Sequence, residues 1–153
     1  MLATLRHLVL RFTERFFDWR FGISSDTQID LREFGITDAA FHPYNATTYL
    51  RFRQLMKLVP IRAGEDVFLD FGSGLGRVVI LAATYPFRKV IGVELIPELH
   101  AKAQDNVRKA LPRLKCQDIE LHNIDARSFK IPAEVTGDLF LEPVQPAHPP
   151  GRF

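Results

Sequence analysis

A glycine-rich stretch, Asp70-Phe71-Gly72-Ser73-Gly74-Leu75-Gly76, constrains the fold of this chain more than any other feature. It separates two short apolar segments, residues 66–70 and residues 78–83, and the second ends before Pro86. Glycine adopts positive φ and lets a ligand come close to the backbone. The start of a helix offers free N–H groups and a partial positive charge. The pattern therefore predicts a strand, a ligand-binding turn and a helix, in that order.

The segments that follow continue this alternation. Further strands are expected over residues 89–94, 118–122 and 137–141, and a helix is expected over residues 97–111, with a proline at its first position. Strands that alternate with helices favour a parallel, doubly wound sheet. The fold class predicted from this order is α/β.

Two amphipathic helices are expected before the sheet. The second spans residues 48–59 and ends at Pro60. The first helix carries Arg6, Arg11 and Arg15, and a basic amphipathic helix of this kind can lie on a membrane or bind a partner. Because Glu14 and Asp18 dilute the basic character of the first helix, we expect its apolar stripe to pack on the body of the domain or to cover its ligand-binding cleft instead. The stripe follows a period of 3.6 residues and consists of Leu5, Leu8, Val9, Phe12, Phe16 and Trp19.

Composition excludes several classes of protein. The 153 residues suit one domain, and 46% hydrophobic with 25% charged residues is typical of a globular protein. A net charge of +2 does not call for nucleic acid or an anionic membrane, so a nucleic-acid partner is not favoured. No apolar run is long enough to span a bilayer, so no membrane insertion is expected. The single cysteine, Cys116, excludes an internal disulfide and favours the cytoplasm. The five histidines are scattered without metal-ligand spacing, so no metal is expected.

The glycine spacing distinguishes between possible ligands. Arg77 stands where a dinucleotide-binding fingerprint would have its last glycine, and Asp70 would repel a pyrophosphate. The same carboxylate attracts a ligand that carries an ammonium and a sulfonium. A nicotinamide-dependent oxidoreductase is therefore a distant alternative. Arg77 itself is expected to pack or pair on the surface of the domain.

Two acidic residues follow the next strands. Glu94 closes the second strand and can accept hydrogen bonds from both hydroxyls of a ribose. Asp125 follows the third strand, where it can bind an adenine amino group or can simply shape a turn or cap a helix.

These segments resemble motif I, the post-I motif and the adenine-binding motif of class I S-adenosylmethionine (SAM) dependent methyltransferases. Residues 68–77 are similar to the corresponding stretch of bacterial methyltransferase-like proteins distantly related to the Dot1-type lysine methyltransferases, and so are residues 17–23 and 44–47 upstream. The resemblance extends over most of residues 17–141. It implies a Rossmann-like sheet in the order 3-2-1-4-5-7-6, with SAM across the carboxyl ends of strands 1 and 2.

The resemblance also implies the cofactor site. Residues 44–47 would lie near the methionine end of SAM as a lid, or Thr47 or Thr48 would only cap the next helix. No catalytic residue is assigned, because such enzymes act mainly by positioning and desolvation, and the methyl acceptor is left unidentified. The expected cofactor-binding residues are Tyr44, Thr47, Asp70, Phe71, Gly72, Ser73, Gly74, Gly76, Glu94, Leu95, Asp125 and Ala126.

The chain departs from the family after the fourth strand. Residues 142–153 are proline-rich, so strands 5 to 7 are missing and the sheet order would be 3-2-1-4. We expect an N-terminal helical segment and lid in residues 1–60, a SAM-binding half domain in residues 61–141, and an irregular tail. The sequence therefore favours a truncated or frame-shifted product. Its fourth strand would be an exposed edge of the sheet, which favours self-association. The alternatives to a methyltransferase are a SAM-binding remnant without turnover and, more distantly, a nucleic-acid-binding module that uses the arginines of the first helix.

Overall fold

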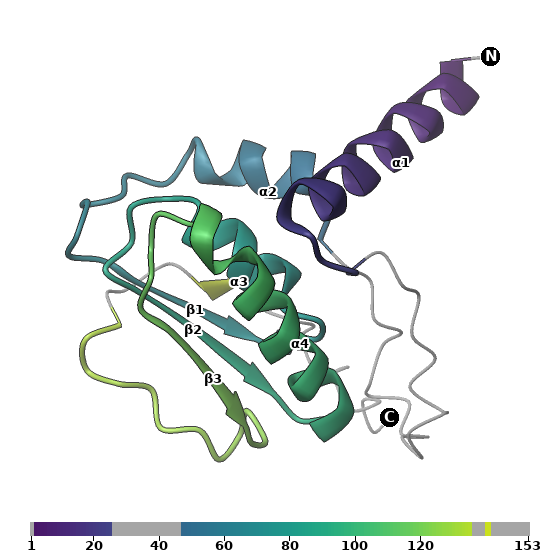
Figure 1. Ribbon diagram of the computed structural model, residues 1–153. Coiled ribbons are helices and arrows are strands. Elements are labelled where there is room, and N and C mark those ends of the chain that lie inside the picture. The colour runs from purple at the N-terminus through teal and green to yellow at the C-terminus, as the bar shows by residue number, and fades with distance from the viewer. Residues whose placement is uncertain (1, 26–46, 136–139, 142–153) are drawn as a thin grey trace, which may run out of the picture.

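The computed structural model describes residues 2–25, 47–135 and 140–141, and it has the α/β class expected from the sequence (Figure 1). Side chains are described from residue 8 onward within these ranges, and those of residues 140–141 are not. The elements in chain order are α1 (Leu2–Phe21), α2 (Tyr49–Met56), β1 (Val67–Phe71), α3 (Arg77–Ala83), β2 (Lys89–Glu94), α4 (Pro97–Ala110), the 3-10 helix η2 (Leu111–Arg113), β3 (Ile119–Asn123) and β4 (Phe140–Leu141).

The four strands form one parallel sheet in the order β3-β2-β1-β4. Asp70 of β1 lies opposite Gly92 of β2, and Glu94 of β2 lies opposite Asn123 of β3. The carboxyl ends of β1, β2 and β3 therefore meet at one edge of the sheet. In the described part of the chain β4 is an outermost strand of the sheet and pairs only with β1. Self-association through β4 stays a prediction.

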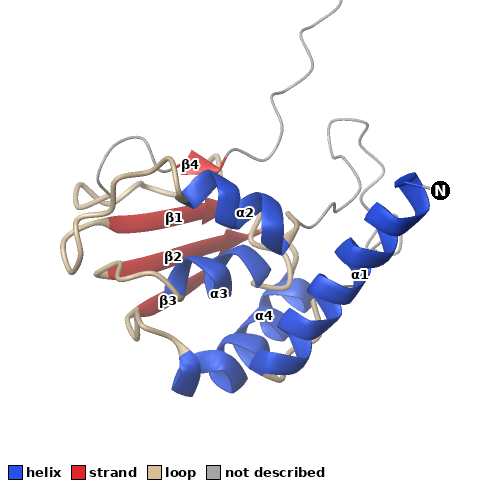
Figure 2. Ribbon diagram, turned by 90° about the horizontal axis from the view of Figure 1, so that it is seen from above, coloured by secondary structure: helices blue, strands red, loops and turns tan. Residues whose placement is uncertain are grey.

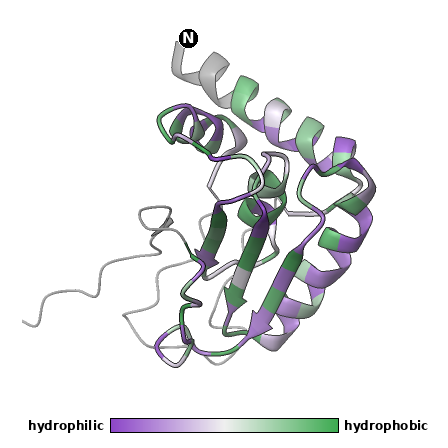
Figure 3. Ribbon diagram, turned by 90° about the vertical axis from the view of Figure 1, so that its left-hand side faces the viewer, coloured by the Kyte–Doolittle hydropathy of each residue, from purple (hydrophilic) through white to green (hydrophobic). Residues whose placement is uncertain are grey.

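The two faces of the sheet are covered differently. Helices α3 and α4 lie on one face, as Figure 2 shows, and Phe68 and Val90 point into the core between sheet and helices. On the other face Leu69 and Ile91 pack with Phe129 from the segment after β3. Strands buried on both faces need near-continuous apolar sequence, and β1 and β2 are largely green in Figure 3.

The helices begin close to the predicted positions. Thr48 is the N-cap of α2, where its side chain accepts a hydrogen bond from the Arg51 N–H at 3.3 Å. Helix α2 ends at Met56, three residues short of the predicted end, and the chain then turns. Pro97 is the first residue of α4 as predicted, because a proline at that position loses no intrahelical hydrogen bond.

The expected packing of the apolar stripe of α1 is wrong. Leu8, Phe12 and Trp19 are 68%, 73% and 76% exposed, whereas Phe17 and Phe21 on the opposite side of the helix are buried. The periodicity identified the helix, but it did not distinguish between two apolar arcs. The arc that carries Phe17 and Phe21 is buried because polar contacts of Glu14 and Asp18 attach that side of α1 to the domain.

These contacts converge on Arg77, the first residue of α3. Its Nε donates to the Ser25 hydroxyl at 2.8 Å, its Nη1 pairs with Glu14, and its Nη2 lies 3.8 Å from Asp18. Arg77 forms an ion pair as expected, but the side chains of Arg77 and Glu14 are only 3% and 7% exposed, so the predicted position of Arg77 on the surface is wrong. Glu14 also accepts a hydrogen bond from the Tyr49 N–H at 2.9 Å, which connects α2 to the same ion pair.

We predict that Arg77→Met lowers the free energy of unfolding by about 3–5 kcal/mol, because it leaves buried carboxylates without their cation. Arg88→Met is the matched control. The Arg88–Glu134 pair is about 40% exposed, and its loss should cost less than about 1 kcal/mol. Urea unfolding followed by circular dichroism measures both, and equal losses in the two variants would contradict the structural role of Arg77.

Candidate cofactor-binding site

The glycine-rich turn is held against the end of β2 by backbone hydrogen bonds. The N–H groups of Gly72 and Ser73 both donate to the Val93 carbonyl oxygen, at 2.8 and 3.0 Å. Gly72, Gly74 and Gly76 have φ values of 71°, 52° and 80°, in the region where side chains cause strain. The three glycines of the motif are thus required by the backbone geometry that brings the turn across the end of the neighbouring strand.

Glu94 fixes this turn with its side chain. The residue is 6% exposed, one carboxylate oxygen accepts the Gly74 N–H at 2.7 Å, and the other accepts the Ile96 N–H at 2.8 Å. Each carboxylate oxygen has two acceptor positions, so the side chain retains capacity for two further donors. Glu94 therefore shapes the loop and can still bind a ligand.

Two further residues that shape the site were not assigned a role from the sequence. The Asn123 side-chain amide donates to the carbonyl oxygens of Glu94 and Leu95, at 2.8 and 3.0 Å. A Cβ atom on Gly92 would lie 2.7 Å from Leu121 Cδ2, 2.8 Å from Val79 Cγ2 and 3.1 Å from Ser73 Cβ, the last of which belongs to the turn. Gly92 is thus the residue that lets the turn approach β2. A polar residue at a strand end and a glycine inside an apolar strand are the signals that could have identified them.

Asp70 is a buried carboxyl group beside a second one. It is 5% exposed, and within the described part of the chain no hydrogen bond to its side chain is observed. Desolvation by burial, followed by the negative charge of Glu94, raises the pKa of Asp70 to about 8. A cation bound between Asp70 and Glu94 would favour the ionised carboxylate and so oppose both effects that raise the pKa of Asp70. The site is therefore electrostatically suited to a positively charged ligand.

Asp125 shapes a turn. Its carboxylate accepts the Arg127 N–H at 2.9 Å and the Arg127 side chain at 3.0 Å, and these bonds lower the pKa of Asp125 to about 2. Of the two roles that the sequence allowed for Asp125, the structure shows the one in a turn. The contact with adenine stays a prediction. The Ile124 N–H donates to the Glu94 carbonyl oxygen at 3.1 Å, which holds this segment beside the end of β2.

Of the remaining predicted site residues, three lie at the sheet edge that carries the turn, one lies just before α2, and one is outside the described residues. Phe71 ends β1 beside the ring of Phe129, with centroids 6.0 Å apart, and Leu95 and Ala126 are exposed at the same edge of the sheet. Thr47 is half-buried just before α2. Tyr44 lies outside the described residues, so the lid stays a prediction.

Neither a metal site nor a membrane span is found in the part of the chain that the structure describes. No cluster of three or more His, Cys, Asp or Glu side chains there could hold a metal ion. No helix among those residues is long and apolar enough to cross a bilayer.

Comparison with known protein families gives a match that covers more than half of the chain. The family described as histone methylation protein DOT1 matches residues 41–135, which is well over half of the 153 residues and includes the whole glycine-rich turn.

Curated relatives match shorter stretches. An uncharacterized RNA methyltransferase of Chlamydia trachomatis is 41% identical over 66 residues, which is 43% of this chain and 15% of the relative. The H3 lysine-79 specific histone-lysine N-methyltransferase of Drosophila melanogaster is 40% identical over 52 residues, 33% of this chain and 3% of the relative. The chain thus spans only a small part of the length of these relatives.

A solved RNA methyltransferase from Salinibacter ruber, in complex with S-adenosyl-L-homocysteine, is similar in structure. It is 28% identical with a TM-score of 0.48, and the match covers 56% of this chain and 53% of that one.

The pKa of Asp70 predicts how stability depends on pH. Between about pH 4 and pH 8 the carboxyl is protonated in the folded chain and ionised in the unfolded chain, so unfolding releases a proton. The free energy of unfolding should therefore fall as pH rises through this window, with a contribution from Asp70 of at most about 1.4 kcal/mol per pH unit. Asp70→Asn should remove that contribution.

The measurement is a series of urea unfolding curves between pH 5 and pH 8. Asp118→Asn, at an exposed side chain, is the control and should keep the pH dependence of the unchanged chain. An unaltered slope in Asp70→Asn would show that Asp70 is ionised in the folded chain.

Proposed function

This chain belongs to the family of histone methylation protein DOT1, which agrees with the resemblance found in its sequence. From this premise we propose that the chain binds SAM and serves the transfer of the methyl group of SAM to an acceptor, with S-adenosyl-L-homocysteine as the product that leaves. The observation that carries the proposal is the pair of buried carboxyl groups, Asp70 and Glu94, on either side of a turn of positive-φ glycines. Residues 61–141 are proposed to form the cofactor-binding half, and residues 1–60 the N-terminal segment and lid.

The residues of the site would suit SAM in charge and in backbone geometry. Asp70 would face the ammonium and sulfonium of the ligand, and the absent side chains of Gly72 and Gly74 would allow close approach to the backbone. The absent Cβ of Gly76 instead lets the turn pack on Ala103 of α4, because a Cβ there would lie 3.2 Å from Ala103 Cβ. The remaining acceptor positions of Glu94 suit the two ribose hydroxyls.

The adenine would lie at the sheet edge next to Leu95 and Ala126, with Asp125 toward its amino group. Thr47 and Tyr44 would approach the methionine end.

The chain's own residues act mainly by positioning and by electrostatics. SAM supplies a methyl group already activated on a sulfonium. Asp70 would hold the cationic end of the ligand and Glu94 its ribose, and the turn, which is fixed to Val93 and Glu94, would position the ligand for methyl transfer. Because the cation favours the ionised form of Asp70, its binding should release a proton below about pH 8.

We place this activity in the cytoplasm. The free thiol of Cys116 is buried, and burial raises its pKa above the usual range, which suits a structural thiol in a reducing compartment.

We predict that calorimetric titration with SAM gives saturable binding to the unchanged chain. Glu94→Gln should weaken it by about 10- to 100-fold, because charge-assisted hydrogen bonds to the ribose are lost. Glu120→Gln, on the neighbouring strand β3, removes a carboxylate of similar size outside the site and should bind SAM like the unchanged chain. Gly74→Asp places a side chain and a charge in the turn and should abolish binding.

Circular dichroism verifies that each variant is folded. A folded chain that does not bind SAM, or equal affinities of Glu94→Gln and Glu120→Gln, would overturn the cofactor site. Transfer of a radiolabelled methyl group to RNA or to histone lysine peptides tests turnover, since these are acceptors named for the relatives. Binding without transfer to either would favour a SAM-binding remnant.

A further inference from the structure

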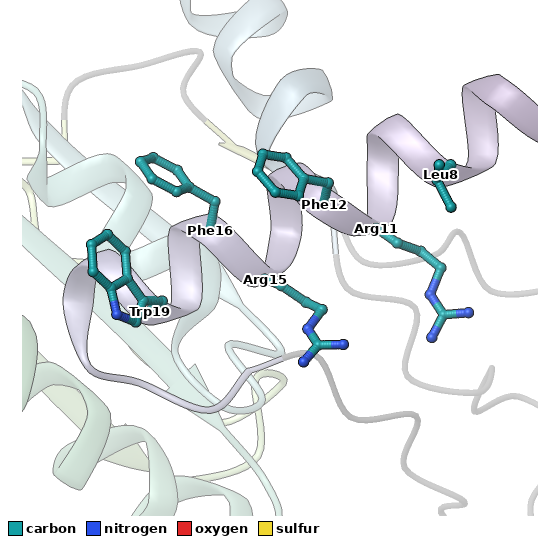
Figure 4. Close-up of a pocket in the computed structure, with 6 residues that line it drawn as sticks. All are labelled: Leu8, Arg11, Phe12, Arg15, Phe16 and Trp19. Carbon is teal, nitrogen blue, oxygen red and sulfur yellow. The ribbon is translucent and has the colours of Figure 1, made fainter.

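The outward face of α1 combines exposed apolar side chains with arginines. We call the set Leu8, Val9, Phe12, Phe16 and Trp19 the outer stripe; each member is about half exposed or more. Arg11 and Arg15 run along one side of the outer stripe, and together with Leu8, Phe12, Phe16 and Trp19 they line a shallow open pocket (Figure 4). From Leu8 to Trp19 the outer stripe extends about 16 Å along the helix.

No carboxylate is exposed on the described side chains of this helix. Glu14 is buried in the ion pair with Arg77, and the Asp18 side chain is only 13% exposed beside the same arginine. The charged side chains that α1 presents outward, over the residues whose side chains are described, are Arg11, Arg15 and Arg20. The two acidic residues that dilute the basic face in the sequence are thus turned toward the domain.

This combination requires an occupant that is both anionic and apolar. A duplex nucleic acid would satisfy the arginines but would leave Leu8 and Val9 facing phosphates and water. A second copy meeting this face about a two-fold axis would bring Arg11 and Arg15 close to the same residues of its partner. An acidic phospholipid surface offers phosphate headgroups directly above an apolar layer, which suits arginines that run beside an exposed aromatic stripe.

We propose that α1 docks this protein on anionic phospholipid membranes, with the outer stripe at the boundary between headgroups and acyl chains and with Arg11 and Arg15 on the phosphates. The helix lies in the membrane surface and does not cross it. The net charge of the whole chain is only +2, so the attraction is local to α1. The rings of Phe12, Phe16 and Trp19 follow one another at centroid distances of 6.4 and 5.6 Å, which forms a continuous apolar ridge for insertion.

The chain contains its own reporter, because Trp19 is its single tryptophan and is 76% exposed. Titration with vesicles of phosphatidylcholine and phosphatidylglycerol should shift its fluorescence emission to the blue, and the protein should sediment with the vesicles. Vesicles of phosphatidylcholine alone should bind it weakly, and salt should weaken binding to the mixed vesicles.

Three variants that keep Trp19 define the interaction. Arg11→Gln with Arg15→Gln should weaken partitioning by about 30-fold. Phe12→Ser with Phe16→Ser should weaken it by at least about tenfold. Leu58→Ser removes a 79% exposed apolar side chain outside the outer stripe and should bind like the unchanged chain.

The proposal is overturned if mixed vesicles give no blue shift, or if Leu58→Ser loses as much binding as the stripe variant. It is also overturned if the shift appears with RNA and not with vesicles, or if it follows protein concentration without lipid, as a second copy would produce. The readout does not use SAM, so its outcome is independent of the proposed methyl transfer.

Discussion

The attachment of the glycine-rich turn to the end of β2 is the constraint on which the site depends. Two backbone N–H groups of the turn share the Val93 carbonyl oxygen, and a third donates to the buried Glu94 carboxylate. Parallel strands put the carboxyl ends of β1 and β2 side by side, and the absence of a side chain at Gly92 lets the turn cross that edge. The same contacts bring Asp70 and Glu94 together. The attachment of the turn to β2 therefore determines both the geometry of the turn and the negative charge beside Asp70.

The turn is also the point at which the N-terminal segment joins the sheet. Arg77 directly follows Gly76, and its guanidinium reaches Ser25, Glu14 and Asp18, while Glu14 accepts a bond from the start of α2. One buried cation therefore connects α1, α2 and α3 next to the glycine-rich turn. Buried ion pairs add little net stability compared with apolar packing, but removal of one partner is costly. Their effect here is to fix which face of α1 points inward.

That choice of face decides what the surface of α1 presents. With Glu14 and Asp18 turned inward, the outward arc carries arginines and large apolar groups, the composition of a helix that lies at a membrane surface. The composition of the helix as a whole did not reveal this, because its two acidic residues partly offset its arginines in a sum over all faces. Segregation of charge around a helix axis, rather than net charge, determines such a surface.

Much of the fold was determined by the sequence alone. The strands over residues 67–71, 89–94 and 119–123, the start of α4 at Pro97 and the glycine turn were predictable, because apolar runs, prolines and positive-φ glycines act locally. The acidic side chains at the strand ends were predictable too, since parallel strands place their carboxyl ends at one edge. Only the tertiary structure decided the rest: the buried position of Arg77, the exposure of the outer stripe, and the roles of Gly92 and Asn123. Each of these depends on a contact between segments far apart in the chain, such as Arg77 with Glu14, and periodicity along one segment carries no information about the partner that lies against it.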